Sequence, residues 1–222
     1  FLKNFTTVLT QGLKAAGGIP VWVMMANSLV MALGIAIGKI AISITAAYAI
    51  VYFRFPGREL CFVLIFITLM MPVEVRIVPT FQVAANLNFI DSYLGLVLPL
   101  IASATATFLY RQMFMTIPAE LLEAARIDGA NSLKILFYVT IPNIKNSLAL
   151  CALLRTIDSF RLFDKVNLLT GGGPANSTST ITQYLYNYGI KSLDFGFGSA
   201  GAIVMTVLVL LLSSVYIKRA IS

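Results

Sequence analysis

The sequence predicts an all-α integral membrane protein with about five transmembrane helices, and two observations carry this prediction. First, 59% of the 222 residues are hydrophobic and only 11% are charged, whereas soluble domains contain about 25% charged residues. A soluble globule of this size has too little core to hide so much apolar surface, and a disordered chain would be poor in apolar residues. Second, five segments have the length and the apolar character that a membrane span requires.

Four of the five segments meet the requirement of about 20 mostly apolar residues well. They extend from about Pro20 to Ile50, from Ser92 to Tyr110 and from Phe195 to Ile217, and one starts near Leu60, is uncharged to Val73 and then meets Glu74 and Arg76. The remaining segment, from about Asn143 to Val166, contains Arg155, Asp158, Arg161 and Asp164 among its charged residues, so hydropathy alone would miss it. Together the five segments predict one transmembrane domain that covers residues 1–222.

The distribution of basic residues predicts the orientation of this domain. With the N-terminus outside, eight of the sixteen Lys and Arg residues lie on the cytoplasmic side and six lie outside, and the bias is sharpest beside the most apolar spans. Residues 1–19 are then an external lead, residues 111–142 a cytoplasmic loop and residues 167–194 an external loop. Because the chain opens on Phe1 and no signal peptide precedes it, we expect an earlier span to be missing.

The long cytoplasmic loop predicts a helix, a glycine turn and a second short helix that lie on the membrane surface. Ala124 and Ala125 give the first helix a low-profile face that a larger partner can grip. The residues expected to fix this geometry are Pro118 and Glu120 in the first turn, Gly129 at the end of the first helix, Asn131 or Ser132 as the cap of the second, Leu133, Leu136 and Phe137 on one face of it, and Pro142 at its end.

The spacing of residues within this loop is specific. Glu123-Ala124-Ala125 is followed after three residues by Gly129, and after nine more by Val139-Thr140-Ile141-Pro142. This run resembles the EAA loop of bacterial ABC importer permeases, whose pattern is EAA, three residues, Gly, nine residues and Ile-x-Leu-Pro. The resemblance implies that Glu123, Ala124, Ala125, Gly129 and Pro142 form the contact with a cytoplasmic ATPase subunit, and Gly129 would allow the tight turn.

Further segments resemble the carbohydrate-uptake branch of these permeases, which includes maltose and glycerol-3-phosphate importers. Residues 20–142 are most similar to the sn-glycerol-3-phosphate type, at Asn27–Ala32, Arg54–Pro56, Met71–Arg76 and Asp91–Gly95. The second half resembles the partner-type sugar permease instead, at Arg155–Asp164 and Leu169–Pro174. Which of the two permease subunit types the chain represents, and which solute it passes, therefore stay open.

This resemblance implies an assembly as well as a fold, usually with six spans in each permease subunit. The expected partners are a second permease subunit, a cytoplasmic ATPase dimer, an external solute-binding protein and the lipid bilayer of the bacterial inner membrane. ATP and magnesium would bind to the ATPase, so no cofactor is expected in this chain and no catalytic residue. The net charge of +7 is explained by the two membrane faces and does not indicate nucleic acid.

Charged residues inside a span are costly and therefore suggest a role. Arg155, Asp158 and Arg161 are spaced by three residues and form a polar stripe along one helix face with Asp164. They could line a water-filled solute pathway, or they could form a structural ladder of ion pairs near the outer interface. Lys39 could snorkel, cap a helix end or bind a ligand, and an anionic solute would favour a contact with Lys39, Arg155 or Arg161.

Two regions on the outer side each allow two interpretations. Glu74 and Arg76 lie near the predicted outer mouth, where a delivering protein could dock, or they anchor the helix at the interface. The stretch Thr170–Thr180 is rich in Gly, Ser, Thr and Pro and forms either a gate or docking loop or a plain connector.

Several other patterns have simpler explanations than a nucleotide or metal site. Gly196-Phe-Gly198-Ser-Ala-Gly201 matches G-x-G-x-x-G but opens an apolar span, so its small residues should allow close helix approach. The run Gly34–Ile40 is a near miss to a P-loop within a span. The chain has no histidine, so we expect no metal site and no Ser-His-Asp machinery, and its two cysteines, Cys61 and Cys151, should be buried as small apolar residues.

The sequence therefore predicts a permease subunit of a binding-protein-dependent ABC importer for a sugar or sn-glycerol-3-phosphate, coupled to a separate ATPase. The alternative is a secondary transporter driven by an ion gradient, which would use charges at the midplane and usually an internal repeat. No repeat is visible in the sequence, and the EAA-like loop would have no explanation. An intramembrane enzyme would need a convergent nucleophile or metal cluster, for which a chain without histidine has few options.

Overall fold

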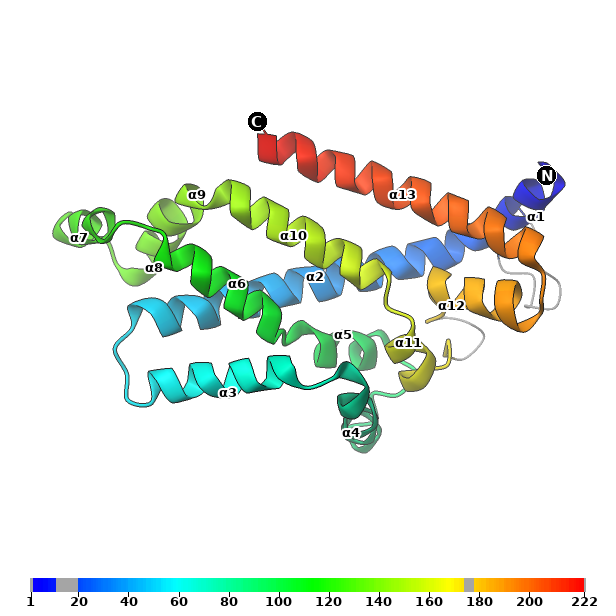
Figure 1. Ribbon diagram of the computed structural model, residues 1–222, viewed down its shortest axis with the longest axis horizontal. Coiled ribbons are helices and arrows are strands. Elements are labelled where there is room, and N and C mark those ends of the chain that lie inside the picture. The colour runs from blue at the N-terminus through cyan, green and yellow to red at the C-terminus, as the bar shows by residue number, and fades with distance from the viewer. Residues whose placement is uncertain (1, 11–19, 174–177, 222) are drawn as a thin grey trace.

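The computed structural model describes residues 2–10, 20–173 and 178–221, and these ranges fold into helices without a strand (Figure 1). Two helices, α2 (Val21–Tyr52) and α13 (Phe195–Ile221), are long and apolar enough to cross a membrane unbroken. Three bent helix pairs meet the same length and composition criteria, so the described residues contain up to five spans. The predicted all-α membrane fold is confirmed.

The bent pairs differ widely in their angles. The first joins α3 (Arg58–Met70) to α4 (Val73–Asn86) with a bend of 108°, and the second joins α5 (Tyr93–Ile101) to α6 (Ala104–Met115) with a bend of 42°. The third bends by 84° between the segment Ser132–Asn143 and α10 (Lys145–Phe160). The remaining helices are α1 (Leu2–Thr10), α7 (Ala119–Ile127), α8 (Ser132–Lys134), the π-helix η2 (Ile135–Thr140), α9 (Ile141–Asn143), α11 (Asp164–Leu169), α12 (Ile181–Leu185) and the π-helix η4 (Tyr186–Lys191).

Local chemistry explains where these helices start and stop. Helix α3 ends at Met70 because Pro72 disfavours a helical conformation for Met71, which is extended at φ −76° and ψ 126°. Ser92 caps α5 by accepting a hydrogen bond from the Gly95 N–H at 3.1 Å. Ser103 caps α6 in the same way through the Ala106 N–H at 3.3 Å, so both halves of the second bent span have their own N-terminal cap.

Three apolar clusters hold the bundle together. One packs α2 and α6 against α7, η2 and α10 around Tyr110 and Phe114. A second packs α1, α12 and α13 against the start of α2 around Tyr184 and Phe197. A third joins the middle of α2 to α4, α5 and α11 around Leu96. In Figure 1, α7 lies at one end of the molecule beyond the turn from α2 to α3, and α11 and α12 lie toward the opposite end.

The fourth span and its flanks differ in detail from the prediction. Helix α10 ends at Phe160 rather than near Val166, and Arg161 forms its C-cap. Asp164 then opens α11, where an acidic side chain favours a helix N-terminus. The expected external loop at residues 167–194 contains α12 and η4, and the external lead contains α1, whereas residues 11–19 and 174–177 lie outside the described residues.

Candidate functional site

Residues 119–143 form the helix–turn–helix unit that the sequence predicts. Helix α7 ends at Ile127 with Asp128 as its C-cap, and the next residue, Gly129, has a φ of +78°, a left-handed conformation that suits glycine. The Gly129 N–H donates to the Arg126 carbonyl and the Ala130 N–H donates to the Ala125 carbonyl, both at 3.0 Å. This pair of bonds is a Schellman motif, which satisfies the last carbonyls of the helix.

The second half of the unit is capped and attached to the bundle. Asn131 is the cap, because its Oδ1 accepts a hydrogen bond from the Lys134 N–H at 2.8 Å. The hydroxyl of Tyr48, on α2, donates to the Ser132 carbonyl at 2.9 Å. Leu122 and Leu136 are buried in the cluster that also contains Tyr48. The unit is therefore fixed to one end of the bundle by packing and by a hydrogen bond.

The outer surface of the unit exposes both charged and large apolar side chains. Glu123 and Ala124 are exposed and Ala125 is half-buried against the core. Ile127 is 86% exposed and Tyr138 is 80% exposed, which is unusual for large apolar side chains on a stable surface. The geometry thus presents the EAA-like residues on an exposed surface of mixed polarity, whose large apolar side chains a partner can cover.

The prediction that Leu133, Leu136 and Phe137 share one face of the second helix is wrong in part. Leu133 and Phe137 are exposed together, whereas Leu136 is only 3% exposed and packs into the core. Residues 135–140 form the π-helix η2, whose wider turn changes the angular spacing of side chains from that of an α-helix. Pro142 is exposed on α9, next to the 84° bend that leads into α10.

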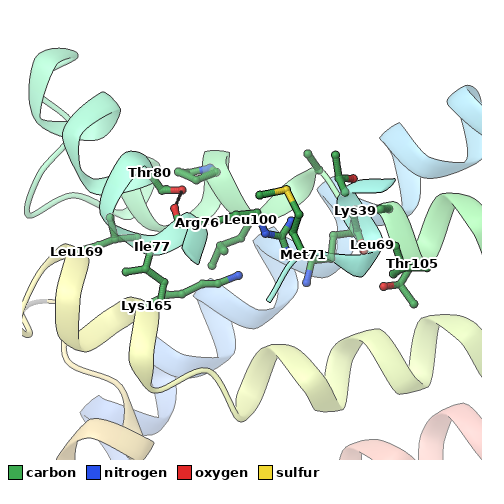
Figure 2. Close-up of a pocket in the computed structure, with 15 residues that line it drawn as sticks. Lys39, Leu69, Met71, Arg76, Ile77, Thr80, Leu100, Thr105, Lys165 and Leu169 are labelled. Atoms are coloured by element: carbon green, nitrogen blue, oxygen red, sulfur yellow. Dashed lines mark hydrogen bonds between the residues drawn. The ribbon is translucent and has the colours of Figure 1, made fainter. Parts of the chain in front are cut away.

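A cavity of about 410 Å³ lies where two bent spans meet α2 and α11 (Figure 2). Met71 from the break between α3 and α4 lines it, as do Ala102 and Ser103 from the break between α5 and α6. The hydroxyl-bearing side chains of Thr68, Thr80 and Thr105 line it as well. The helix breaks therefore create a partly polar space inside an apolar bundle.

Three basic side chains from different elements line this cavity. Lys39 comes from α2, Arg76 from α4 and Lys165 from α11, and Figure 2 shows the side chains of Arg76 and Lys165 extending toward the middle of the cavity. We call these three residues the cationic triad. Lys39 and Lys165 are half-buried, and Arg76 is more exposed. No Asp or Glu occurs in the lining that the structure describes.

The triad is not neutralised by close acidic partners. Within the described residues the ion pairs are Arg58 with Glu59 and Arg155 with Asp158, and neither involves the triad. Lys165 lies outside the five candidate spans, and burial lowers the pKa of its ammonium group. The positive charge of Arg76 lowers that pKa further, whereas the carboxylate of Asp164 raises it. The arrangement can attract an anion.

The predicted polar stripe on the fourth span is only partly assembled. Arg155 Nη1 and Asp158 Oδ2 form an ion pair at 3.3 Å, as the ion-pair interpretation requires. Arg161 is exposed at the C-cap of α10. None of the three lines the cavity, and a role in a solute pathway remains a prediction for them.

Sequence reasoning singled out Lys39 but did not place Arg76 and Lys165 beside it. The sequence predicts Arg76 at the outer mouth, and Lys165 is one of the six basic residues that it predicts outside. The feature of the sequence that could have indicated this position for Arg76 is Pro72. A proline can break a membrane span, and the chain after the break can then fold back so that its charged residues lie against the bundle. The side chain of Glu74, the other residue expected at the mouth, lies outside the described residues.

The remaining sequence motifs have structural explanations. The close approach expected at Gly198 is confirmed, since a Cβ there would lie 2.6 Å from the Cα of Gly189. The described residues hold no group of three metal-ligating side chains. Cys151 is buried as predicted, but Cys61 is exposed, because α3 has no buried residue and presents its apolar side chains to the surroundings.

Known proteins show where this chain belongs. A permease protein of the sn-glycerol-3-phosphate transport system, UgpE of Yersinia pestis bv. Antiqua (strain Antiqua), is 63% identical over 130 residues, which are 59% of this chain and 46% of that protein. UgpE of Salmonella typhimurium (strain LT2) is 55% identical over 148 residues, 67% of this chain and 52% of that protein. The chain thus spans about half the length of the curated relatives it matches.

Solved structures support the fold. A bacterial ABC transporter involved in the import of the acidic polysaccharide alginate matches with a TM-score of 0.76 at 23% identity, over 92% of this chain and 77% of that one. A second structure, of a bacterial alginate ABC transporter in complex with a pentasaccharide-bound periplasmic protein, gives a TM-score of 0.72 at 16% identity, over 87% and 76% of the two chains. The sequence profile described as "Binding-protein-dependent transport system inner membrane component" matches residues 39–219. The chain therefore belongs to this family of multi-pass inner-membrane transport components.

Proposed function

We propose that this chain is a permease subunit of a binding-protein-dependent ABC importer and forms part of the translocation pathway for a sugar or sn-glycerol-3-phosphate. The observation that carries the proposal is the helix–turn–helix unit at residues 119–143, which is packed against the bundle on one side and exposes the EAA-like residues with large apolar side chains on the other. Family membership and the relatives named as permease proteins support it. The chain itself would perform no chemical step.

The unit is suited to receive movement from a cytoplasmic ATPase. Glu123, Ala124 and Gly129 would contact the ATPase, and Ala125 and Pro142 would support that contact from the inner side and from the bend. ATP and magnesium would bind to the ATPase dimer, a second permease subunit would complete the pathway, and an external binding protein would deliver the solute. ATP-driven closure of the ATPases would then move the unit and open the cavity outward.

A matched pair of glycines tests this proposal. Gly129 and Gly57 have φ values of +78° and +79°, and a Cβ at either position would meet nothing within 4 Å. Replacing either glycine by Leu therefore adds a similar backbone strain of about 1–2 kcal/mol. Only Gly129→Leu places a bulky side chain on the EAA-like surface. We expect Gly129→Leu to abolish ATP-dependent uptake in reconstituted vesicles, and Gly57→Leu to retain most of it.

Membrane insertion and copurification with the ATPase are measured alongside uptake. Equal uptake in the two variants would show that residues 119–143 do not form the ATPase contact. Solute uptake that persists after the ATPase is removed would overturn the whole proposal and would favour the ion-gradient-driven alternative. Uptake that depends on ATP and is lost only in Gly129→Leu supports it.

A further inference from the structure

In the described part of the chain no carboxylate forms an ion pair with the cationic triad; Asp158 and Asp164 interact with Lys39 and Lys165 only from beyond ion-pair distance. Like charges that share a partly enclosed space repel each other, and each charged group loses part of its hydration on burial. Lys39 and Lys165 are half-buried, so both costs apply to them. An arrangement of this kind is more stable when an anion occupies the cavity.

The helix breaks around the cavity add to this preference. Helix α6 begins at Ala104, so its positively polarised N-terminal end is part of the wall, together with Ser103 and Thr105. Broken helices that line a cavity inside a membrane protein are a common way to bind polar solutes. The helix N-terminus at the break before α6 therefore adds to the preference for an anion, which depends mainly on the three basic side chains.

The donors indicate what kind of anion fits. Arg76 offers a planar fork that matches the oxygens of a phosphate, and the two lysines offer compact positive charges. Three cations balance a dianion better than a monoanion. The hydroxyls of Thr68 and Thr80 donate to backbone carbonyls, so their oxygens can accept hydrogen bonds from the hydroxyl groups of a polyol. A volume of about 410 Å³ admits a small solute.

We propose that Lys39, Arg76 and Lys165 form a binding site for the phosphate group of a small phosphomonoester within the translocation pathway. This inference rests on the proposed function and deepens it, because it assigns an anionic solute rather than a neutral sugar to the chain. The three residues touch the solute directly and act together with the hydroxyls that line the same cavity.

The test uses the assembled importer, which consists of this chain with its partner permease, ATPase and binding protein, in vesicles of phosphatidylcholine. Uptake of sn-glycerol-3-phosphate is measured for Lys39→Met, Arg76→Gln and Lys165→Met. Each substitution removes a charge-assisted contact, so we expect uptake to fall about tenfold or more in each variant. Lys165→Arg keeps the charge and should restore most of the uptake. The control is Lys191→Met, at an exposed cation that does not line the cavity, and should stay within about twofold of the parent.

A second readout separates a binding role from a structural one. In the absence of solute, removing one of three repelling cations should leave the thermal midpoint of the complex unchanged or raise it. Residues that merely hold the fold would instead lower the midpoint and the uptake together. A combined fall in midpoint and uptake in all three variants therefore overturns the proposal, as does uptake within twofold of the parent.

The remaining outcomes distinguish this inference from the proposed function. ATP-dependent uptake of a neutral disaccharide with no uptake of the phosphomonoester would overturn the phosphate site and leave the importer function intact. Absence of ATP-dependent uptake of either solute would overturn the importer function itself. Stabilisation by phosphatidylglycerol that is lost in the variants, with phosphomonoester uptake unchanged, would assign the cavity to a lipid headgroup and overturn the proposal.

Discussion

The contact between Gly198 on α13 and Gly189 on η4 allows a quantitative prediction. A Cβ added at Gly198 would lie 2.6 Å from the Cα of Gly189, and an ordinary contact requires at least 3.4 Å. The two helices would have to separate by about 0.8 Å, because backbone atoms cannot turn away as a side chain can. Overpacking of this kind costs about 1–3 kcal/mol. Because alanine favours a helix by about 1 kcal/mol over glycine, we expect Gly198→Ala to destabilise the fold by a net amount of up to about 2 kcal/mol.

Gly201 provides the control on the same helix. A Cβ there would lie 2.7 Å from Cδ2 of Leu185, which is the end of a flexible side chain that can change its rotamer. Both substitutions replace a helical glycine by alanine, which by itself favours a helix by about 1 kcal/mol. Gly201→Ala should therefore remain within about 1 kcal/mol of the parent protein.

The assay is the thermal midpoint of the detergent-solubilised complex, followed by the loss of its monodisperse chromatography peak after heating. At about 2–4 °C per kcal/mol for a chain of this size, Gly198→Ala should lower the midpoint by several degrees. Equal midpoints for Gly198→Ala and the parent would refute the inference that η4 and α13 are in backbone contact. Equal falls in the thermal midpoint of Gly198→Ala and Gly201→Ala would show that a clash with the Leu185 side chain costs as much as a clash with the Gly189 backbone.

Two hydrogen bonds give further predictions. Ser28→Ala removes the acceptor of the buried Ile181 N–H, at 2.8 Å, and should cost about 1–3 kcal/mol in thermal stability. An unchanged midpoint would mean that this N–H has another partner in the folded protein. Tyr48→Phe removes the donor to the Ser132 carbonyl, worth about 0.5–1.5 kcal/mol, and should lower the amount of solute imported per ATP hydrolysed. The control is Tyr52→Phe, which removes a hydrogen bond to the Phe114 carbonyl at 2.8 Å within the bundle and should lower stability alone. An equal loss of import in Tyr48→Phe and Tyr52→Phe would contradict this prediction.

The sequence was sufficient to predict the straight spans and the helix–turn–helix unit because their signals are local. The run from Val21 to Tyr52 is apolar throughout, and hydropathy finds such a helix without knowledge of its neighbours. Gly129 and Asn131 act within a few residues of their own position, through backbone conformation and a side-chain cap. Local rules of this kind can be read from a single sequence.

The cavity could not be predicted in the same way because it depends on bend angles and on elements far apart in the chain. Lys39 and Lys165 are separated by more than a hundred residues, and only the 108° bend after Met70 brings Arg76 to the same space. A proline predicts that a break exists but does not predict its direction. The hydrogen bonds of Asn27 and Ser28 could not be predicted for the same reason. Their partners, Ser179 and Ile181, lie on a distant segment across the packed helices.

The packing of the helix–turn–helix unit has a mechanical consequence. Leu122 and Leu136 share one close-packed cluster with Tyr48 on α2, Phe114 on α6 and Cys151 on α10. Close-packed interiors have low compressibility, so a displacement of this unit would also displace α2, α6 and α10. A loop without these packing contacts could change its own conformation and would not transmit the displacement to the spans. The helix breaks after Met70 and Ile101 contribute no residue to this cluster, and residues of both breaks line the cavity.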